Sequence, residues 1–108
     1  MTTKITLIID NPTDPAGFEQ AYQPIVQLAQ QLPAVRKVES AKVWPKEDGT
    51  PTPAHRTLDL YFDSYHEASA AVETPVAADL FGQLAATGTS FTGLFSDIEA
   101  AESGAGTE

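Results

Sequence analysis

The order of the apolar segments constrains the fold of this chain more than any other feature. Short runs rich in β-branched residues alternate with longer stretches in which apolar residues recur every three or four positions. The pattern predicts strand, helix, strand, strand, helix and strand, at residues 4–10, 15–32, 35–44, 55–62, 65–86 and 88–98. With right-handed crossovers, this order produces an α+β fold, the ferredoxin-like βαββαβ sandwich, in which a four-stranded antiparallel sheet carries two helices on one face.

The first helix has clear signals at both ends. Asp14 is a good N-cap, Pro15 fits the first helical position, and Pro33 ends the helix. Between these ends one apolar stripe is formed by Phe18, Tyr22, Ile25, Ala29 and Leu32. The second helix begins after the N-cap Ser64, and we expect it in two pieces because Thr74 and Pro75 interrupt it.

Pro24 lies inside the first helix, where proline is unfavourable. It removes the hydrogen bond to the Gln20 carbonyl and clashes with it, at a cost of about 3 kcal/mol. We therefore expect a kink near Tyr22, or a helix in two segments, that shapes the wall of a pocket.

The strands differ in the faces that they bury. The continuous apolar run at 4–10 predicts a strand buried on both faces. Neither face of 35–44 is cleanly apolar, so we expect this strand to be partly exposed or bulged near Ser40. In 55–62, Leu58, Leu60 and Phe62 face one way, and the other, open face receives His55, Thr57, Asp59 and Tyr61.

The open face of the predicted sheet needs a cover, because it mixes polar with apolar side chains. Pairing with the same face of a second copy provides one, so we expect a two-fold homodimer whose sheets close into a barrel-like body. We expect a single domain over residues 1–98 and a flexible acidic tail at 99–108.

The composition argues against several classes of function. The net charge of −9 makes the chain a poor ligand for nucleic acid and for anionic membranes. The absence of cysteine excludes disulfides, zinc–thiolate sites and thiol catalysis. The N-terminus has no signal-peptide architecture, so we expect a cytoplasmic protein. No histidine has the spacing to acidic residues that a metal site requires, and no phosphate loop or dinucleotide motif predicts a cofactor.

Four stretches carry a resemblance to a known family: KITLIIDNP at 4–12, QQLPAVRKVESAKV at 30–43, LDLYFDS at 58–64 and ATGTSFTGLF at 86–95. Together they resemble the EthD-like proteins of the dimeric α/β-barrel superfamily, from Lys4 to about Phe95. The resemblance implies a ferredoxin-like protomer, a homodimer, and a pocket between sheet and helices. Relatives in the superfamily include cofactor-free monooxygenases, polyketide cyclases and lactone isomerases that act on small aromatic or hydrophobic molecules.

One departure from the family pattern bears on mechanism. EthD-like proteins usually carry a histidine in a His-x-Pro-Leu pattern on the first helix. Depending on the alignment, this position is Ile25 or Tyr22 here, and neither is a histidine. The departure argues against acid–base chemistry by a histidine of this helix.

Asp59 and Tyr61 are the predicted catalytic residues. A carboxylate between two leucines is out of place unless it faces a polar cavity or a partner, and in a pocket it would serve as a general base. The alternative is a structural carboxylate, paired across the sheet with Lys37, Lys42 or Arg56. Tyr61 shares its face and would orient a ligand oxygen, or would pack in the dimer interface or the core.

The predicted ligand-binding residues are Tyr22, Ile25, Trp44 and His55. The first three would be apolar pocket walls, and His55 begins the strand that carries Asp59. The alternatives are interface or core packing for Trp44 and a surface position for His55. His66, in the first turn of a helix, is predicted to be exposed.

Two functions remain open on the sequence. The first is a dimeric pocket protein for a small hydrophobic or aromatic molecule, with cofactor-independent oxidoreductase (monooxygenase), cyclase or isomerase chemistry. The second is a non-catalytic dimeric ligand-binding or accessory protein of a degradation or biosynthetic pathway, which the missing helix histidine favours.

Overall fold

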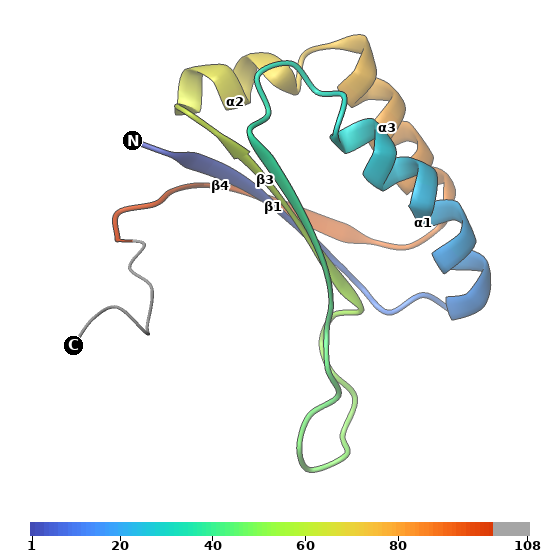
Figure 1. Cartoon of the computed structure of the whole chain (residues 1–108). Helices are drawn as coiled ribbons and strands as arrows, with labels where there is room; N and C mark the ends of the chain where they lie inside the picture. Colours follow the sequence, from blue (N-terminus) through green and yellow to red (C-terminus); the bar gives the residue numbers. More distant parts are fainter. Residues whose placement is uncertain (101–108) are drawn as a thin grey trace.

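The computed structural model describes residues 1–100, and its elements follow the predicted order (Figure 1). They are β1 (Thr3–Ile9), α1 (Pro15–Ala29), β2 (Lys37–Lys42), β3 (Arg56–Phe62), α2 (Tyr65–Ala71), α3 (Pro75–Ala86) and β4 (Phe91–Asp97). The strands form one sheet in the order β2-β3-β1-β4, and each neighbouring pair is antiparallel. The helices lie on one face of this sheet (Figure 1). The predicted α+β ferredoxin-like fold is confirmed, while the predicted acidic tail lies largely outside the described residues.

The core lies between the helices and the two central strands. Alternate residues of β1 and β3 point toward the helices, since side chains along a strand alternate between faces. They meet the predicted stripe of α1, all of whose members are buried, and the inner faces of α2 and α3. The largest fully buried side chains include Phe62, Ile5, Leu7, Ile25 and Leu80.

The N-terminal ends of the helices confirm the predicted caps, whereas α1 ends at Ala29, three residues before the predicted end at Leu32. The Asp14 side chain accepts a hydrogen bond from the Gly17 amide, at 3.2 Å, and the Ser64 side chain accepts one from Glu67, at 3.2 Å. A second cap, Thr74, starts α3 at Pro75, so the predicted interruption between the two helical pieces is confirmed.

Of the two effects expected of Pro24, a kink or a helix in two segments, the second is wrong. The helix runs without interruption from Pro15 to Ala29 with Pro24 inside it. Pro24 and Gln20 both lie on the exposed side of the helix. The Gln20 carbonyl, which lacks the proline N–H as a partner, therefore faces water, and this lowers the cost of the break.

One prediction about the strands is wrong, and one is confirmed. β1 buries only one face: Thr3, Ile5, Leu7 and Ile9 are buried, and the residues between them are half-buried. The apolar run was misleading because Ile8, although apolar, points to the open face. β2 is mostly exposed, which confirms the first of the two expected alternatives, and it pairs with β3 in continuous register from Lys37 to Lys42, without the bulge near Ser40 that was the second.

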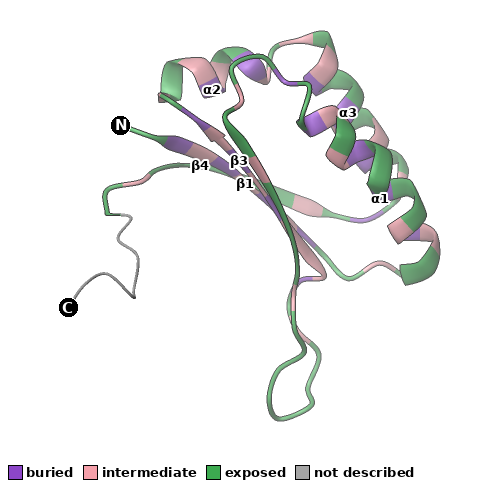
Figure 2. Ribbon diagram, viewed as in Figure 1, coloured by how far each residue is buried: buried purple, intermediate pink, exposed green. Residues whose placement is uncertain are grey.

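Between β2 and β3 the chain forms a long hairpin that projects beyond the sheet and away from the helices (Figure 1). We call residues 43–55 the hairpin arm. Most of it is exposed (Figure 2). Asn11, just after β1, donates a hydrogen bond from its side chain to the Thr52 carbonyl, at 2.7 Å, and so ties the base of the arm to the sheet.

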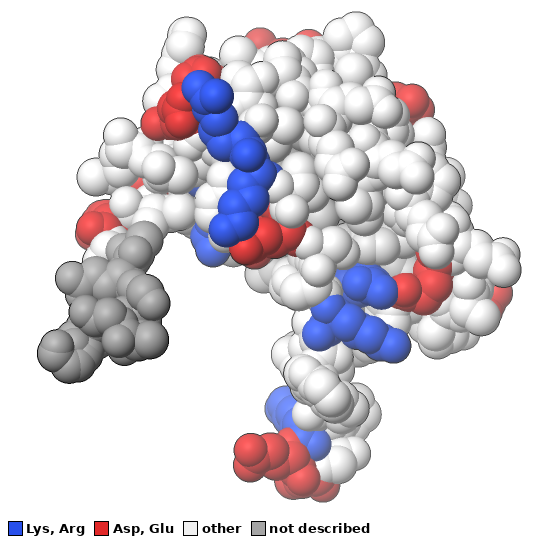
Figure 3. Space-filling view, viewed as in Figure 1, with Lys and Arg blue, Asp and Glu red and all other residues white. Residues whose placement is uncertain are grey.

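On the face shown in Figure 3, positive and negative side chains are interleaved, and lysines and arginines lie beside acidic side chains. The ion pairs are Arg36–Asp63, Lys37–Glu39 and Arg56–Glu19, among others. No helix within residues 1–100 is long and apolar enough to span a membrane.

Candidate functional site

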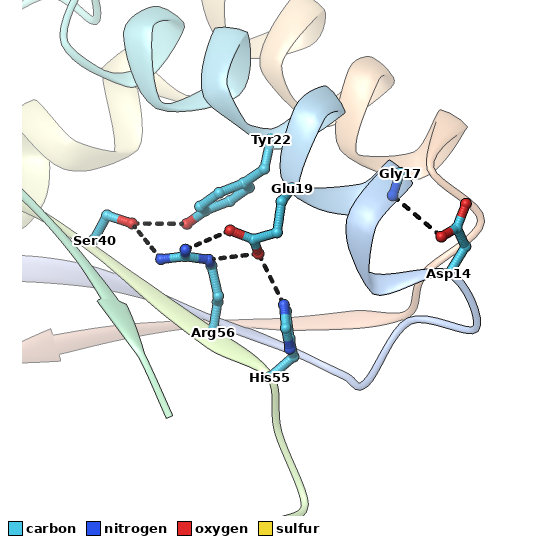
Figure 4. A network of polar contacts seen from close by, with 7 residues as sticks. All are labelled: Asp14, Gly17, Glu19, Tyr22, Ser40, His55 and Arg56. Atoms are coloured by element: carbon cyan, nitrogen blue, oxygen red, sulfur yellow. Dashed lines mark hydrogen bonds and ion pairs between the residues drawn. The ribbon is translucent and has the colours of Figure 1, made fainter. Parts of the chain in front are cut away.

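A polar network connects the first half of α1 to the start of β3 (Figure 4). Arg56 binds both carboxylate oxygens of Glu19, with Nε–Oε2 at 2.9 Å and Nη2–Oε1 at 2.5 Å. His55 Nε2 lies 2.8 Å from the same Glu19 Oε2. We call Glu19, His55 and Arg56 the Glu19 network. A bidentate arginine–carboxylate pair fixes both groups in orientation, so the network is a rigid feature of the fold.

Aromatic rings surround this network. The Arg56 guanidinium lies 5.2 Å from the centroid of the Tyr22 ring, which itself stacks on Phe18 at 5.3 Å. The edge of His55 meets Phe18 at 5.5 Å. Arg56 and Tyr22 also both lie 3.5 Å from the Ser40 hydroxyl, which links the network to β2 (Figure 4).

The prediction that His55 shares the open face with Asp59 is wrong. The chain bends at His55, one residue before β3 begins, so the strict alternation of the strand does not extend to it. Its ring turns toward α1, to Glu19 and Phe18. The His55 backbone is held on both sides, because its amide donates to Ile9 at 2.7 Å and its carbonyl accepts from Val43 at 3.0 Å.

The Glu19 network changes the ionisation of its members. Hydrogen bonds from Arg56, and to a smaller extent from His55, lower the pKa of Glu19 from 4.5 to about 2, against the opposing effect of burial. The Glu19 hydrogen bond raises the pKa of Arg56. Burial raises the pKa of the Tyr22 phenol. At neutral pH the network is therefore an ionised carboxylate between a permanent cation and an imidazole, beside a neutral phenol.

Two hollows flank the Glu19 network. The first, here called the Tyr22 groove, has a volume of about 340 Å³, and its lining includes Glu19, Tyr22, Val26, Gln27, Ser40 and Arg56. The second, here called the Trp44 hollow, has a volume of about 530 Å³ at the base of the hairpin arm, and its lining includes Asn11, Lys42, Trp44, Pro45, Thr52 and His55. The Glu19–His55 bond joins the two, since each partner lines one of them.

Three of the four predicted ligand-binding residues line a hollow, and the fourth lies in the core. Tyr22 lines its groove, and Trp44 and His55 line the same hollow. Trp44 is 87 % exposed, so it is not part of the protomer core. Ile25 is fully buried in the core. The structure thus brings Trp44 and His55 together, with Tyr22 on the other side of Glu19, and places Ile25 behind them.

Asp59 and Tyr61 lie on the opposite, open face of the sheet. Asp59 accepts a hydrogen bond from Thr6 at 2.5 Å and lies 3.9 Å from Lys4 Nζ. Asp59 is therefore paired across the sheet, as in the expected alternative, but its partner is Lys4 and not one of the predicted cations. Lys37 pairs with Glu39, and Arg56 points to the helix side.

Tyr61 belongs to a second cluster on this face. Its hydroxyl donates to Glu39 at 2.7 Å, and Lys37 lies 5.1 Å above its ring. The bond to Glu39 raises the pKa of Tyr61 to about 12, and with Lys37 it lowers the pKa of Glu39. A phenol held in this way is a poor acid at neutral pH.

Sequence reasoning missed Glu19 and did not place Arg56 beside it. One signal for Glu19 was present: it is the single charged residue in α1. A lone carboxylate three residues before the buried Tyr22 lies at the border of the apolar stripe, where a cation from the sheet can reach it. The partner was not readable, because it depends on which strand lies beneath α1.

Within residues 1–100, no group of three or more acidic or histidine side chains is arranged to hold a metal ion. His66 is exposed on α2, as predicted. The side chains of the Glu19 network can bind, orient and exchange a proton with a ligand through a carboxylate, a guanidinium and an imidazole.

No family model matches the chain. A curated relative does: the uncharacterized 11.0 kDa protein in the thcB-thcC intergenic region of Rhodococcus erythropolis is 36 % identical over 101 residues, which cover 89 % of this chain and 94 % of the relative. This chain belongs to the same family as that Rhodococcus protein. The match extends over nearly the whole length of both chains, so their folds correspond throughout.

Solved structures give the fold a name. An EthD family protein of Bacillus halodurans superimposes with a TM-score of 0.81 at 17 % identity, covering 91 % of this chain and 99 % of its own. A variant of SnoaB, a cofactor-independent oxygenase of Streptomyces nogalater, has a TM-score of 0.71 at 10 % identity, covering 93 % and 95 %. A dimeric protein of unknown function with a ferredoxin-like fold, from Bacteroides fragilis, has a TM-score of 0.68 at 13 % identity, covering 90 % and 96 %.

These likenesses confirm the EthD-like, ferredoxin-like fold that the sequence motifs indicated. At such identities they describe the backbone and not the reaction.

Proposed function

We propose that this protein is a homodimer that binds a small hydrophobic or aromatic molecule beside the first half of α1. The observation that carries the proposal is the Glu19 network and its position between the Tyr22 groove and the Trp44 hollow. Charged groups on an element that otherwise packs the core are costly unless they are paired, and here the Glu19 carboxylate is bonded to both Arg56 and His55.

The surroundings of the network fit a ligand with a flat apolar body and one polar oxygen. Tyr22 and Val26 supply apolar surface in the groove, and Trp44 and Pro45 supply it in the hollow. The Ser40 hydroxyl and the guanidinium of Arg56 supply hydrogen-bond donors at the border. The Trp44 hollow, with its mostly apolar lining and a few polar groups, has the usual form of a small-molecule pocket, whereas the lining of the Tyr22 groove is more polar.

The homodimer is proposed from the open face of the sheet. Ile8, Tyr61 and Leu94 lie on it, and the helices of this chain cover only the other face. Leu94 is 47 % exposed. Proteins of similar fold are described as dimeric. A two-fold pairing of these faces would bury the exposed apolar side chains of both copies.

The catalytic roles predicted for Asp59 and Tyr61 remain a separate proposal. Both side chains lie on the open face and line neither the Tyr22 groove nor the Trp44 hollow. They would meet a ligand in the space between two paired sheets. Asp59→Asn tests this role, because a substitution that changes neither ligand affinity nor turnover excludes it.

A second candidate function, a cofactor-independent oxygenase or isomerase, is favoured by the contact between His55 and Glu19. Such reactions begin by removing a proton from the substrate, and a carboxylate-oriented imidazole is a suitable base. The fold is shared with an oxygenase of this kind. The accessory, non-catalytic alternative differs in one observable respect, since the ligand then leaves chemically unchanged.

Native mass spectrometry tests the proposed function. The expected spectrum of the purified protein is a dimer that carries additional mass, either as isolated or after incubation with a panel of small phenols, quinones and lactones. A monomer at micromolar concentration contradicts the homodimer. A dimer that retains no member of the panel contradicts the binding function.

A further inference from the structure

We propose that His55 is a general base for the O–H group of a small phenol or enol bound in the Trp44 hollow, with Glu19 as the residue that positions the imidazole. This inference deepens the proposed function and rests on it, since it requires a small aromatic ligand at this site. It assigns a proton acceptor to a side chain that the sequence placed on the wrong face of the sheet.

The bond to Glu19 determines which nitrogen of the neutral His55 ring carries hydrogen. Glu19 accepts from the Arg56 Nε–H and Nη2–H groups, and both of its oxygens are therefore acceptors of a carboxylate. His55 Nε2, 2.8 Å from Oε2, must be the donor in the remaining bond. In the neutral imidazole the other nitrogen, Nδ1, then has a free lone pair and is the basic atom.

The Nδ1 atom of His55 is accessible from solvent. Hydrogen bonds of the His55 ring within residues 1–100 run through Nε2. Every fully buried polar side-chain atom in the same part of the chain has a partner. Nδ1 has none and therefore reaches solvent, although the side chain as a whole is only 13 % exposed. The edge of the ring that is open to solvent carries the basic atom, and His55 lines the Trp44 hollow.

His55 is held in place through both its backbone and its ring. The backbone amide and carbonyl of His55 are bonded to β1 and β2. The ring is fixed by Glu19 on one side and by the edge contact with Phe18 on another. A base that is held in this way loses little conformational freedom when a substrate binds.

The lining of the Trp44 hollow suits a planar aromatic ligand. Trp44 and Pro45 provide an apolar wall in a hollow of about 530 Å³, large enough for one or two aromatic rings. Lys42 lines the same hollow, and its ammonium group forms no salt bridge within residues 1–100. An exposed indole beside an unpaired ammonium suits a planar molecule whose oxygen becomes negative.

The proton transfer balances without an oxidant or reductant. The O–H bond of the ligand breaks, its electron pair stays on oxygen, and the proton joins the lone pair of Nδ1. The products are a phenolate or enolate and an imidazolium. The imidazolium remains bonded to the Glu19 carboxylate, which it shares with Arg56, and the oxyanion forms in the hollow that Lys42 also lines. The charged groups that face His55 are Glu19 and Arg56 from α1 and β3, and Lys42 across the hollow.

The experiment uses the full chain and 4-nitrophenol, whose phenolate absorbs at longer wavelength than its phenol. Trp44 is the single tryptophan of the chain, so all tryptophan fluorescence arises at the hollow. We expect saturable quenching of Trp44. At a pH below the pKa of the free probe, we also expect the bound probe to be several-fold richer in phenolate than the free probe.

Substitutions then separate binding from proton transfer. His55→Gln is expected to retain quenching within about threefold and to lose the phenolate enrichment, whereas His66→Gln on exposed α2 is the matched control and should equal the parent. Glu19→Gln is expected to reduce the enrichment and, in ¹⁵N NMR spectra, to shift the His55 ring from the Nε2–H tautomer toward a mixture of both.

Two results would overturn the inference, and they are distinguishable from failure of the proposed function. If 4-nitrophenol quenches Trp44 but is equally ionised in the parent and in His55→Gln, His55 is not the base, and the binding function stands. If Glu19→Gln changes the tautomer without changing the enrichment, the positioning role of Glu19 is refuted. If neither 4-nitrophenol nor the other phenols bind, the site itself is refuted.

Discussion

The Glu19–Arg56 pair makes a quantitative prediction about stability. The pKa of the Glu19 carboxyl is about 2 in the folded protein, against 4.5 for an unperturbed glutamate. Each pKa unit corresponds to about 1.4 kcal/mol, so the full difference corresponds to about 3 kcal/mol at neutral pH. The Glu19 side chain is 34 % exposed, and solvent screening reduces this figure to about 1–2 kcal/mol.

The sign follows from the direction of the pKa change. Because folding lowers the pKa of Glu19, its ionised form stabilises the fold at every pH above about 4.5, and the stabilisation is lost as the pH falls toward about 2. Glu19→Gln should therefore be less stable than the parent by about 1–2 kcal/mol at pH 7. The difference between the two proteins should shrink as the pH approaches 2.

Urea denaturation from pH 7 to pH 2, at one protein concentration, measures this difference. Glu47→Gln, which removes the same charge from the exposed hairpin arm, is the matched control and should differ little from the parent. Glu19→Gln with the same free energy of unfolding as Glu47→Gln would refute the reasoning. So would a difference from the parent that stays constant down to pH 2, because the lost stability would then not come from ionised Glu19.

Three further predictions concern the helix and the sheet. Pro24→Ala should stabilise the protein by about 1–3 kcal/mol, because alanine restores the hydrogen bond to Gln20, and an unchanged or lower melting temperature would contradict this. Ile25→Ala should cost about 2–5 kcal/mol in chemical denaturation, since Ile25 is fully buried, whereas a wall of an open pocket would cost much less. Leu94→Lys on the open face should raise the dimer dissociation constant at least about tenfold in sedimentation equilibrium, whereas Gln20→Lys on exposed α1 should not, and equal dissociation constants would argue against the sheet interface.

The fold was predictable because its signals are local. The N-caps Asp14 and Ser64, the apolar stripe of α1 and the alternation of β3 each depend on residues that are near in sequence, and each was confirmed. The failures have a common origin in residues whose neighbours come from elsewhere. Ile8 belongs to an apolar run but faces away from the helices, and that run therefore predicted too much burial for β1.

The candidate site was harder to predict for the same reason. Asp59 stood out because it lies between leucines, yet its partners Thr6 and Lys4 come from β1. His55 lies one residue outside β3, and no periodicity indicates where a ring turns at a bend. Glu19 and Arg56 are 37 positions apart, and their contact requires both the strand order and the placement of α1 over the sheet.

The most direct test of the binding site is an amide NMR titration of the ¹⁵N-labelled protein with 4-nitrophenol. The Tyr22 groove and the Trp44 hollow predict chemical-shift changes centred on Glu19, Tyr22, His55 and the Trp44 indole. Changes confined to Asp59 and Tyr61 would move the site to the open face of the sheet, and the absence of saturable changes anywhere would contradict the binding function.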